Sequence, residues 1–467
     1  MRILMLCSEY EGLIKTGGLA DACRGITKAL IEAGHEVQVL LPKYATLYAL
    51  PSTHWESVYF ELGSEHFGCA VRHMTQDGVN VGLVEHDQFF QRARPYDDGE
   101  HGYVDNPLRF AVFCKAAIEW CRQHQFQPDI IHGHDWQTSL AAVYLRQARA
   151  KDDYFHQTRF VFTIHNGAYQ EIVSRDWYHR LGLATDNAPL NLLQQGIQAA
   201  DKINTVSEGY REELLSEPAA NGLADLYQQR AADFVGILNG CDYQLWHPNH
   251  DQHLVAHYDW PVLAGKETCK DWLRQQYNLP LTDVPLFVAV SRITSQKGFD
   301  YLIPALEQWL AQTSAQVLLM GTGESRYTNA LFALAARYSE QCCFVMGFDE
   351  PLSHQIEAAG DFFLMPSLFE PCGLNQIYSL RYGTIPIVRA TGGLKDTVQA
   401  YPEKNSTGIH FHQPTQEDLL QALMQADQLY SQPKIYRAMQ QRGMAQNFSW
   451  QQAGERYQLL YQRAQHK

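Results

Sequence analysis

Two basic side chains that follow a short apolar segment give this sequence its clearest chemical signal. Arg292 and Lys297 lie five residues apart, directly after the apolar residues at 286–290. An arginine guanidinium can bind two oxygens of an anion at once, whereas a lysine ammonium acts as a point charge. Together they suit a diphosphate, although a solvated pair at the start of a helix is the structural alternative. The segment predicts an anion-binding loop at the end of a strand.

A carboxylate and several glycines follow in the same half of the chain. Glu370 lies in the segment Met365–Leu374 (MPSLFEPCGL), and further glycines occupy positions 392 and 393. The carboxylate can accept hydrogen bonds from sugar hydroxyls or stabilise positive charge at an anomeric carbon. The glycines precede two predicted helices, whose free N-terminal amides bind phosphate or sugar oxygens. Helix capping is the structural alternative for Glu370, and the glycine-bracketed context favours a ligand site.

A glycine-rich loop also follows the first apolar segment of the chain. The loop Tyr10–Gly18 (YEGLIKTGG) ends in two glycines, which allow the backbone to approach a ligand closely. Lys15 can project toward the same ligand, and the helix predicted from Leu19 onward presents N-terminal amides that favour an anion. A simple turn is the structural alternative for this loop.

Histidines and aromatic side chains end two further predicted strands. His132, His134 and His165 are conceivable zinc ligands, but no fourth ligand follows at a recognisable spacing. Neutral imidazoles also form hydrogen bonds with sugar hydroxyls, and we favour that interpretation. Trp136 and Tyr169 suit stacking on the apolar face of a pyranose, with ordinary packing as the structural alternative.

The elements that must position these side chains are short apolar segments alternating with amphipathic stretches. Strands are predicted at residues 2–8, 36–42, 81–85, 129–132, 160–164, 202–206, 286–291, 316–320, 342–346, 362–366 and 385–388. This alternation is typical of parallel sheets with helices on both faces. It predicts an α/β fold with two doubly wound, Rossmann-like domains facing each other across a cleft. We expect domains at residues 1–250 and 251–446, and a C-terminal helix at 447–467 that packs back on the first domain.

Composition narrows the class of partner. The 467 residues carry a formal net charge of -14, from 37 basic and 51 acidic side chains. This balance disfavours nucleic acid as the main partner, because phosphate neutralisation needs clustered lysines and arginines. The ten cysteines show no metal-like pairing and are expected to be reduced thiols. With no signal peptide and no apolar stretch near the ~18–20 residues that span a bilayer, we expect a soluble, cytoplasmic protein without membrane contact.

Taken in order, the loops resemble those of bacterial glycogen synthases and plant starch synthases, which are retaining glucosyltransferases of the GT-B fold. The resemblance covers nearly the whole chain. It rests on seven ordered motifs: KTGG at 15–18, HDW at 134–136, HNxAYQ at 165–170, NGxD at 239–242, SRxTxQKG at 291–298, EPCGL at 370–374 and TGGL at 391–394.

The resemblance implies roles for individual residues of this chain. It implies catalytic roles for His165, Arg292, Lys297, Glu370 and Asp135. It implies substrate binding by Lys15, Gly17, Gly18, Asp21, Asn239, Phe348, Cys372, Gly373, Leu374, Thr391 and Gly392. It implies acceptor binding by Tyr96, Trp136 and Tyr169, with Asn239 also meeting the acceptor and Phe348 lying against the adenine.

Several positions depart from the family pattern. Glu11 and Gly12 replace a usual proline step, and Arg24 enters a helix that is usually apolar or small there. Gly167 replaces the usual leucine and Glu171 the following glycine of the HNLAYQ motif. These departures bear on acceptor preference and loop mobility, because the charged residues are all present.

The implied reaction is glucosyl transfer from ADP-glucose to the non-reducing end of an α-1,4-glucan such as glycogen, with retention of anomeric configuration. A retaining hydrolase would need two carboxylates about 5 Å apart, whereas the second half shows only Glu370 at this rim. Front-face attack without a protein nucleophile fits better, and no motif demands a metal or another cofactor. UDP-glucose as donor, a small-sugar acceptor, a sugar-nucleotide epimerase and a non-catalytic glucan-binding protein are the alternatives.

Overall fold

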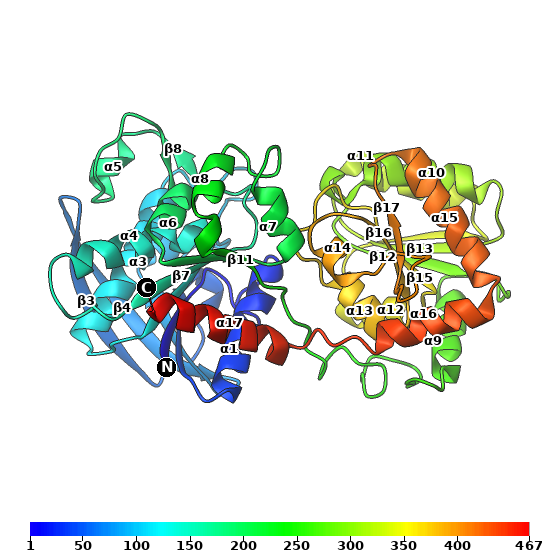
Figure 1. Cartoon of the computed structure of the whole chain (residues 1–467), viewed down its shortest axis with the longest axis horizontal. Helices are drawn as coiled ribbons and strands as arrows, with labels where there is room; N and C mark the ends of the chain where they lie inside the picture. The colour runs from blue at the N-terminus through cyan, green and yellow to red at the C-terminus, as the bar shows by residue number, and fades with distance from the viewer. Residues whose placement is uncertain (467) are drawn as a thin grey trace. The chain divides into compact units, whose positions relative to one another are not determined.

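The computed structural model describes residues 1–466 and divides them into two compact units (Figure 1). Unit 1 contains Met1–Gly240 together with the C-terminal segment from Trp450 onward, and unit 2 contains Cys241–Ser449. Each unit is built on a sheet of mainly or entirely parallel strands with helices packed against it. The predicted α/β class is therefore confirmed.

Unit 1 contains a nine-stranded sheet in the order β11-β10-β7-β6-β1-β2-β5-β4-β3. Its strands are β1 (Arg2–Leu6), β2 (Glu36–Pro42), β3 (His54–Leu62), β4 (Glu65–Gln76), β5 (Val79–Glu85), β6 (Ile130–His134), β7 (Arg159–Ile164), β10 (Lys202–Thr205) and β11 (Phe234–Gly236). A separate two-stranded sheet consists of β8 (Ile172–Val173) and β9 (Leu190–Asn191). The carboxyl ends of the parallel strands meet at one edge, where the candidate loops begin.

The outer edge of this sheet differs from the sequence prediction. β3 pairs antiparallel with β4, and β4 pairs antiparallel with β5, so the sheet is parallel only from β11 to β5. β3 and β4 were not predicted, because buried and exposed residues alternate along the second half of β3 rather than forming a continuous apolar run. Such alternation is typical of antiparallel strands with one solvated face.

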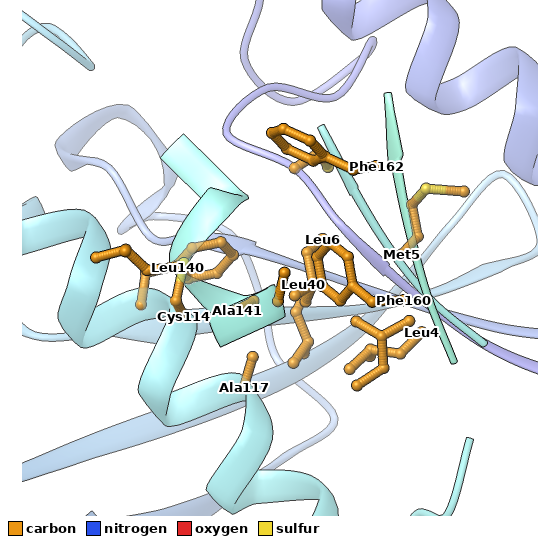
Figure 2. Close-up of a cluster of buried hydrophobic side chains, with 14 of the residues drawn as sticks. Leu4, Met5, Leu6, Leu40, Cys114, Ala117, Leu140, Ala141, Phe160 and Phe162 are labelled. Atoms are coloured by element: carbon orange, nitrogen blue, oxygen red, sulfur yellow. The ribbon is translucent and has the colours of Figure 1, made fainter. Parts of the chain in front are cut away.

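The helices of unit 1 cover this sheet. They are α1 (Gly18–Glu32), α2 (Asp87–Phe90), α3 (Asn106–Gln123), α4 (Trp136–Arg149), α5 (Trp177–Arg180), α6 (Leu192–Ala199), α7 (Glu208–Leu214), α8 (Ala224–Gln229) and α17 (Trp450–Gln465), with 3₁₀ turns at Ala45–Leu47 and Ala231–Asp233. Figure 2 shows Cys114 of α3 and Leu140 of α4 near Leu6, Leu40 and Phe160 of the sheet. This dry packing fixes the strands whose ends carry the candidate loops.

Unit 2 contains a fully parallel six-stranded sheet in the order β14-β13-β12-β15-β16-β17. Its strands are β12 (Leu286–Val290), β13 (Gln316–Gly321), β14 (Cys342–Met346), β15 (Phe362–Met365), β16 (Ile385–Arg389) and β17 (Ile409–Phe411). Its helices are α9 (Ala264–Gln276), α10 (Phe299–Leu310), α11 (Ser325–Arg337), α12 (Glu350–Ala359), α13 (Asn375–Arg381), α14 (Gly392–Thr397), α15 (Gln416–Tyr430) and α16 (Pro433–Met444), with a 3₁₀ turn at Ser295–Lys297. None of the helices in the described part of the chain is long and apolar enough to cross a bilayer.

The first change of unit falls at Gly240, ten residues before the position expected from the sequence. Residues 241–250 belong to unit 2 because Trp246 stacks between two of its side chains. The ring centroid of Trp246 lies 3.6 Å from that of His354 and 3.8 Å from that of Tyr378. The His- and Asn-rich composition of this stretch is typical of a linker and gives no sign of that stack.

The C-terminal helix α17 packs within unit 1. Its Tyr457 and Tyr461 are fully buried. The Tyr461 hydroxyl lies 2.8 Å from Nδ1 of His132, and the Tyr457 hydroxyl accepts a hydrogen bond from Asn204 at 3.2 Å. These contacts link the end of the chain to β6 and β10.

A glycine in α1 makes the docking of α17 possible. A Cβ atom added to Gly25 would lie 2.0 Å from the indole ring of Trp450, far inside van der Waals contact. We expect Gly25→Ala to destabilise the protein by about 1–3 kcal/mol through overpacking, although alanine favours the helix itself. Thermal unfolding should show a midpoint lowered by several degrees.

Gly18→Ala, in the same helix, is the matched control, since a Cβ there meets nothing within 4 Å. An unchanged midpoint for Gly25→Ala would contradict the close approach of α17.

Candidate active site

The loop between β1 and α1 holds its lysine between two carboxylates. The Lys15 ammonium lies 2.8 Å from Oε2 of Glu11 and 2.8 Å from Oδ1 of Asp21. Partial burial opposes ionisation of this ammonium, but the two carboxylates outweigh burial and raise the pKa of Lys15. The side chain stays about half exposed, so a charged lysine paired with two carboxylates lies in the loop just before α1.

Glu9, which the sequence analysis did not single out, fixes the shape of this loop. Its buried carboxylate accepts hydrogen bonds from the Thr16 hydroxyl at 2.6 Å and from the Gly17 amide at 3.2 Å. It also accepts one from the Tyr96 hydroxyl at 2.7 Å. The only sequence signal is an acidic residue directly after a buried strand. Tyr96, predicted to meet the acceptor, thus has its hydroxyl committed to this network.

Gly17 and Gly18 lie at the N-terminus of α1 without any conformational need for glycine. Gly17 is extended, with φ -161°, and neither residue has a positive φ. A Cβ atom added to either would meet no protein atom within 4 Å. The open space above these amides leaves room for an anion to approach the helix terminus.

Asp135 joins β6 to α4 in a backbone conformation that L-residues rarely adopt. Its φ is 56° and its ψ is -178°, a combination that costs on the order of 1–3 kcal/mol. The carboxylate accepts a hydrogen bond from the backbone amide of His165 at 2.7 Å, which links the ends of β6 and β7. Burial raises the pKa of Asp135 to about 7 despite hydrogen bonds from the backbone amides that follow β7. Strained backbone and a shifted carboxyl at a strand end are features of functional sites.

The three histidines predicted near this edge are neutral and engaged with protein atoms. The ring nitrogens of His132 and His134 lie 2.6–3.0 Å from atoms of Tyr461, Thr163, His165 and Met5. Burial lowers the pKa of His132 and of His165 to about 3, and that of His134 well below its ordinary value. His132 and His134 have no exposed surface, so only His165, at the strand end, is placed to reach a ligand.

The other predicted residues of unit 1 differ in exposure. Tyr169 is 61% exposed and offers a free ring, whereas Trp136 is 6% exposed and packs edge-on against Phe110. Asn239 is also buried, and its Oδ1 has no hydrogen-bond partner among the described residues. A buried carbonyl oxygen left unpaired costs about 1–3 kcal/mol, so this atom is suited to bind a ligand hydroxyl or water.

In unit 2, the loops after β12 and β15 bring a cation and a carboxylate together. Lys297 Nζ lies 2.5 Å from Oε2 of Glu370, and the same oxygen accepts a hydrogen bond from the Ser367 hydroxyl at 3.0 Å. Arg292 is exposed, and its guanidinium donates a 3.3 Å hydrogen bond to Gln296. The predicted pair thus separates into one lysine positioned by Glu370 and one arginine free to turn toward an anion.

Glycines allow these loops to approach each other. A Cβ atom on Gly298 would lie 1.9 Å from the carbonyl oxygen of Pro366, and one on Gly392 would lie 2.1 Å from that of Glu370. Both have a positive φ, 80° and 44°. The Gly393 amide donates to the Glu370 carbonyl at 3.0 Å, which ties the N-terminus of α14 to the loop after β15.

The remaining predicted residues of unit 2 lie along the same edge of its sheet. Phe348, between β14 and α12, is 72% exposed, so its ring face is open for stacking on a planar base. Gly373 and Leu374 are half-buried at the start of α13, whereas Cys372 and Thr391 are buried. These positions suit contacts through backbone atoms more than through side chains.

Two family models match consecutive parts of the chain. Residues 2–229 match the starch synthase catalytic domain, and residues 271–445 match the glycosyl transferases group 1. With a doubly wound unit on each side of Gly240, these matches define a glycosyltransferase of the GT-B class.

Individual relatives narrow the class. The glycogen synthase of Aeromonas salmonicida (strain A449) is 42% identical, covering 99% of this chain and 98% of that protein. The glycogen synthase of Aliivibrio fischeri (strain MJ11) is 38% identical over the same shares of the two chains. The catalytic domain of starch synthase IV from Arabidopsis thaliana, bound to ADP and acarbose, superposes with a TM-score of 0.89 at 29% identity, covering 100% of this chain and 99% of that one. The chain belongs to the glycogen synthase family, as the motifs indicated.

The raised pKa of Asp135 predicts a particular pH dependence of stability. An unfolded aspartate loses its proton near pH 4, whereas the folded one keeps it to about pH 7. The folded state therefore binds more protons between these values, and this group's contribution to stability falls as pH rises from about 4 to 7. Asp135→Asn stays neutral and tolerates positive φ, so its stability relative to the unsubstituted protein should rise across this window.

The measurement is the thermal midpoint of both proteins at several pH values between 4.5 and 7.5. Asp153→Asn, at an exposed position, is the control and should follow the unsubstituted protein. Parallel curves for Asp135→Asn would contradict the raised pKa.

Proposed function

We propose that this protein is a glycogen synthase that transfers glucose from ADP-glucose to the non-reducing end of an α-1,4-glucan with retention of configuration. The observation that carries the proposal is the cluster of Lys297, Glu370 and Ser367 at the ends of β12 and β15, with the exposed Arg292 on the same loop. The names of the relatives and the ADP and acarbose of the Arabidopsis structure support a nucleotide-sugar donor and a glucan acceptor.

The proposed donor site uses the two cations for the diphosphate. Arg292 suits bidentate contact with phosphate oxygens, and Lys297 adds a positive charge that is already oriented by Glu370. The Gly393 amide of α14 donates to the Glu370 carbonyl and so holds this loop in place beside the two cations. The open face of Phe348 would receive the adenine.

Transfer breaks the bond from the anomeric carbon to the diphosphate and forms a bond from that carbon to the acceptor oxygen. The acceptor hydroxyl's proton passes to the departing phosphate, so ADP leaves on the face that the acceptor attacks. Glu370 is paired with Lys297, which makes it a poor nucleophile but a good anchor for sugar hydroxyls. Arg292 and Lys297 then stabilise the negative charge that develops on ADP.

His165 and Asp135 complete the proposal on the side of unit 1. The pKa of His165, about 3, keeps its ring neutral, so the ring and its backbone carbonyl can contact the glucosyl unit without adding positive charge to it. Asp135 holds the His165 backbone in place through the amide. Tyr169, with its exposed ring, would stack on an acceptor glucose.

The activity is proposed to lie in the cytoplasm and to need no cofactor. All ten cysteines are free thiols, which suits a reducing compartment.

The charge on the leaving diphosphate is matched by Arg292 and Lys297 instead of a metal ion. Glucosyl transfer should therefore keep its rate in EDTA, measured as ADP release, and a rate lost in EDTA but restored by Mg²⁺ would contradict this.

The direct test of the function is glucose incorporation into glycogen, with ADP-glucose and UDP-glucose supplied in parallel reactions. We expect incorporation from ADP-glucose in clear preference to UDP-glucose, because the structurally similar starch synthase IV catalytic domain is bound to ADP. Preferred incorporation from UDP-glucose would overturn the donor, and ADP release without incorporation would overturn the glucan acceptor.

A substitution tests the role of the lysine. Lys297→Ala should lower kcat on the order of 10²–10³-fold, because charge on the departing ADP loses its partner. Lys434→Ala, an exposed lysine on α16, is the matched control and should keep full activity. Circular dichroism and thermal melting verify the fold, and full turnover by a folded Lys297→Ala would refute the leaving-group assignment.

A further inference from the structure

A cluster of metal-ligating side chains lies on the antiparallel edge of unit 1, apart from every loop described above. His54 and Glu56 are two residues apart on β3 and share one face of the strand, and His73 is the direct cross-strand partner of His54 on β4. One ligand atom from each of these three side chains lies within 4.8 Å of the others. His124, which follows α3, brings its Nδ1 to 3.3 Å from Oε1 of Glu56.

The surrounding hydrogen bonds orient these side chains. Glu56 Oε2 accepts a hydrogen bond from the indole N–H of Trp120 at 2.6 Å and lies 2.9 Å from His73 Nε2. His124 Nε2 lies 3.1 Å from the carbonyl oxygen of Ser57, which can only accept, so the proton of a neutral His124 is on Nε2. The lone pair of Nδ1 then points at the negative Glu56 carboxylate, and two acceptors this close require a proton or a metal cation between them.

We propose that His54, Glu56, His73 and His124 form a binding site for a divalent transition metal of the zinc class. Three imidazole nitrogens and one carboxylate oxygen make up a four-coordinate donor set that Zn²⁺ accepts. The hydrogen bonds from His124 to a backbone carbonyl and from Trp120 to Glu56 are the outer contacts that orient metal ligands.

One ligand must move for the metal to bind. The rings of His54 and His73 stack with centroids 4.4 Å apart and planes 5° apart, so one cation cannot lie in both ring planes. His54 is exposed, and its Nδ1 lies 3.1 Å from the Thr53 hydroxyl, a surface contact that leaves the ring able to rotate. His73 Nε2 and His124 Nδ1 lie 2.9 Å and 3.3 Å from the two different oxygens of the half-buried Glu56 carboxylate, so His54 is the ligand that must turn toward an ion held there.

The site would hold neighbouring elements of unit 1 together and would take no part in the transfer chemistry. It joins β3 and β4 to the end of α3, which packs beside β3 (Figure 1). β3 is the last strand of the sheet, four strands from β1, which at about 4.8 Å per strand is on the order of 19 Å from the glycine-rich loop. Metal binding is therefore expected to stabilise unit 1 without altering glucosyl transfer.

The test is isothermal titration of the EDTA-treated full-length protein with ZnCl₂, together with thermal melting with and without the metal. We expect one equivalent to bind and to raise the melting midpoint. His54→Ala should bind this equivalent at least about tenfold more weakly and lose the midpoint shift, while melting normally without zinc because His54 is exposed. Glu56→Gln, which keeps an acceptor for Trp120, should weaken binding similarly.

His66→Ala is the matched control. His66 lies on the same two strands, directly opposite Glu61 with 3.6 Å between the side chains, but its group has no further histidine within ligand range among the described residues. It should bind zinc as the unsubstituted protein does. The proposal is overturned if the protein takes up no stoichiometric zinc, or if His54→Ala and Glu56→Gln bind it as tightly as His66→Ala.

Discussion

The candidate site of unit 2 depends on how closely three loops approach one another at the carboxyl ends of β12, β15 and β16. Two carbonyl oxygens, those of Pro366 and Glu370, lie where the Cβ atoms of Gly298 and Gly392 would otherwise be. Any larger residue would push these loops apart. Only at this separation can Lys297 reach Glu370 at 2.5 Å, so the electrostatics of the site follow from a steric condition on two glycines.

Unit 1 meets a different constraint, the exclusion of positive charge from the end of β7. In the role proposed for His165, a neutral ring adds no positive charge to the glucosyl unit. Burial keeps His132, His134 and His165 neutral, and it also favours the protonated form of Asp135 near pH 7. In the loop between β1 and α1, two carboxylates partly neutralise the charge of Lys15.

The histidine cluster on β3 and β4 contrasts with the one at the end of β6. His132 and His134 are buried and bonded to protein atoms, whereas His54, His73 and His124 surround a carboxylate at a partly exposed surface. The sequence analysis considered only the first group as possible metal ligands and favoured hydrogen bonding to sugar hydroxyls for it. The second group becomes visible only when β3 pairs with β4 in register and α3 ends beside them.

The sequence by itself determined the α/β class and the parallel strands, because buried parallel strands leave continuous apolar runs that are readable without a partner. It also determined the family, since ordered loop motifs survive as local patterns of charge and glycine. Only the tertiary structure decided three other features. These are the antiparallel edge of the unit 1 sheet, the ring stacking that assigns Trp246 to unit 2 and the hydrogen bond from Thr16 to Glu9. Each of them depends on residues that are brought together from distant positions or on alternating exposure along a strand. The pKa of Asp135 is likewise set by burial, and burial cannot be recognised within one segment of the chain.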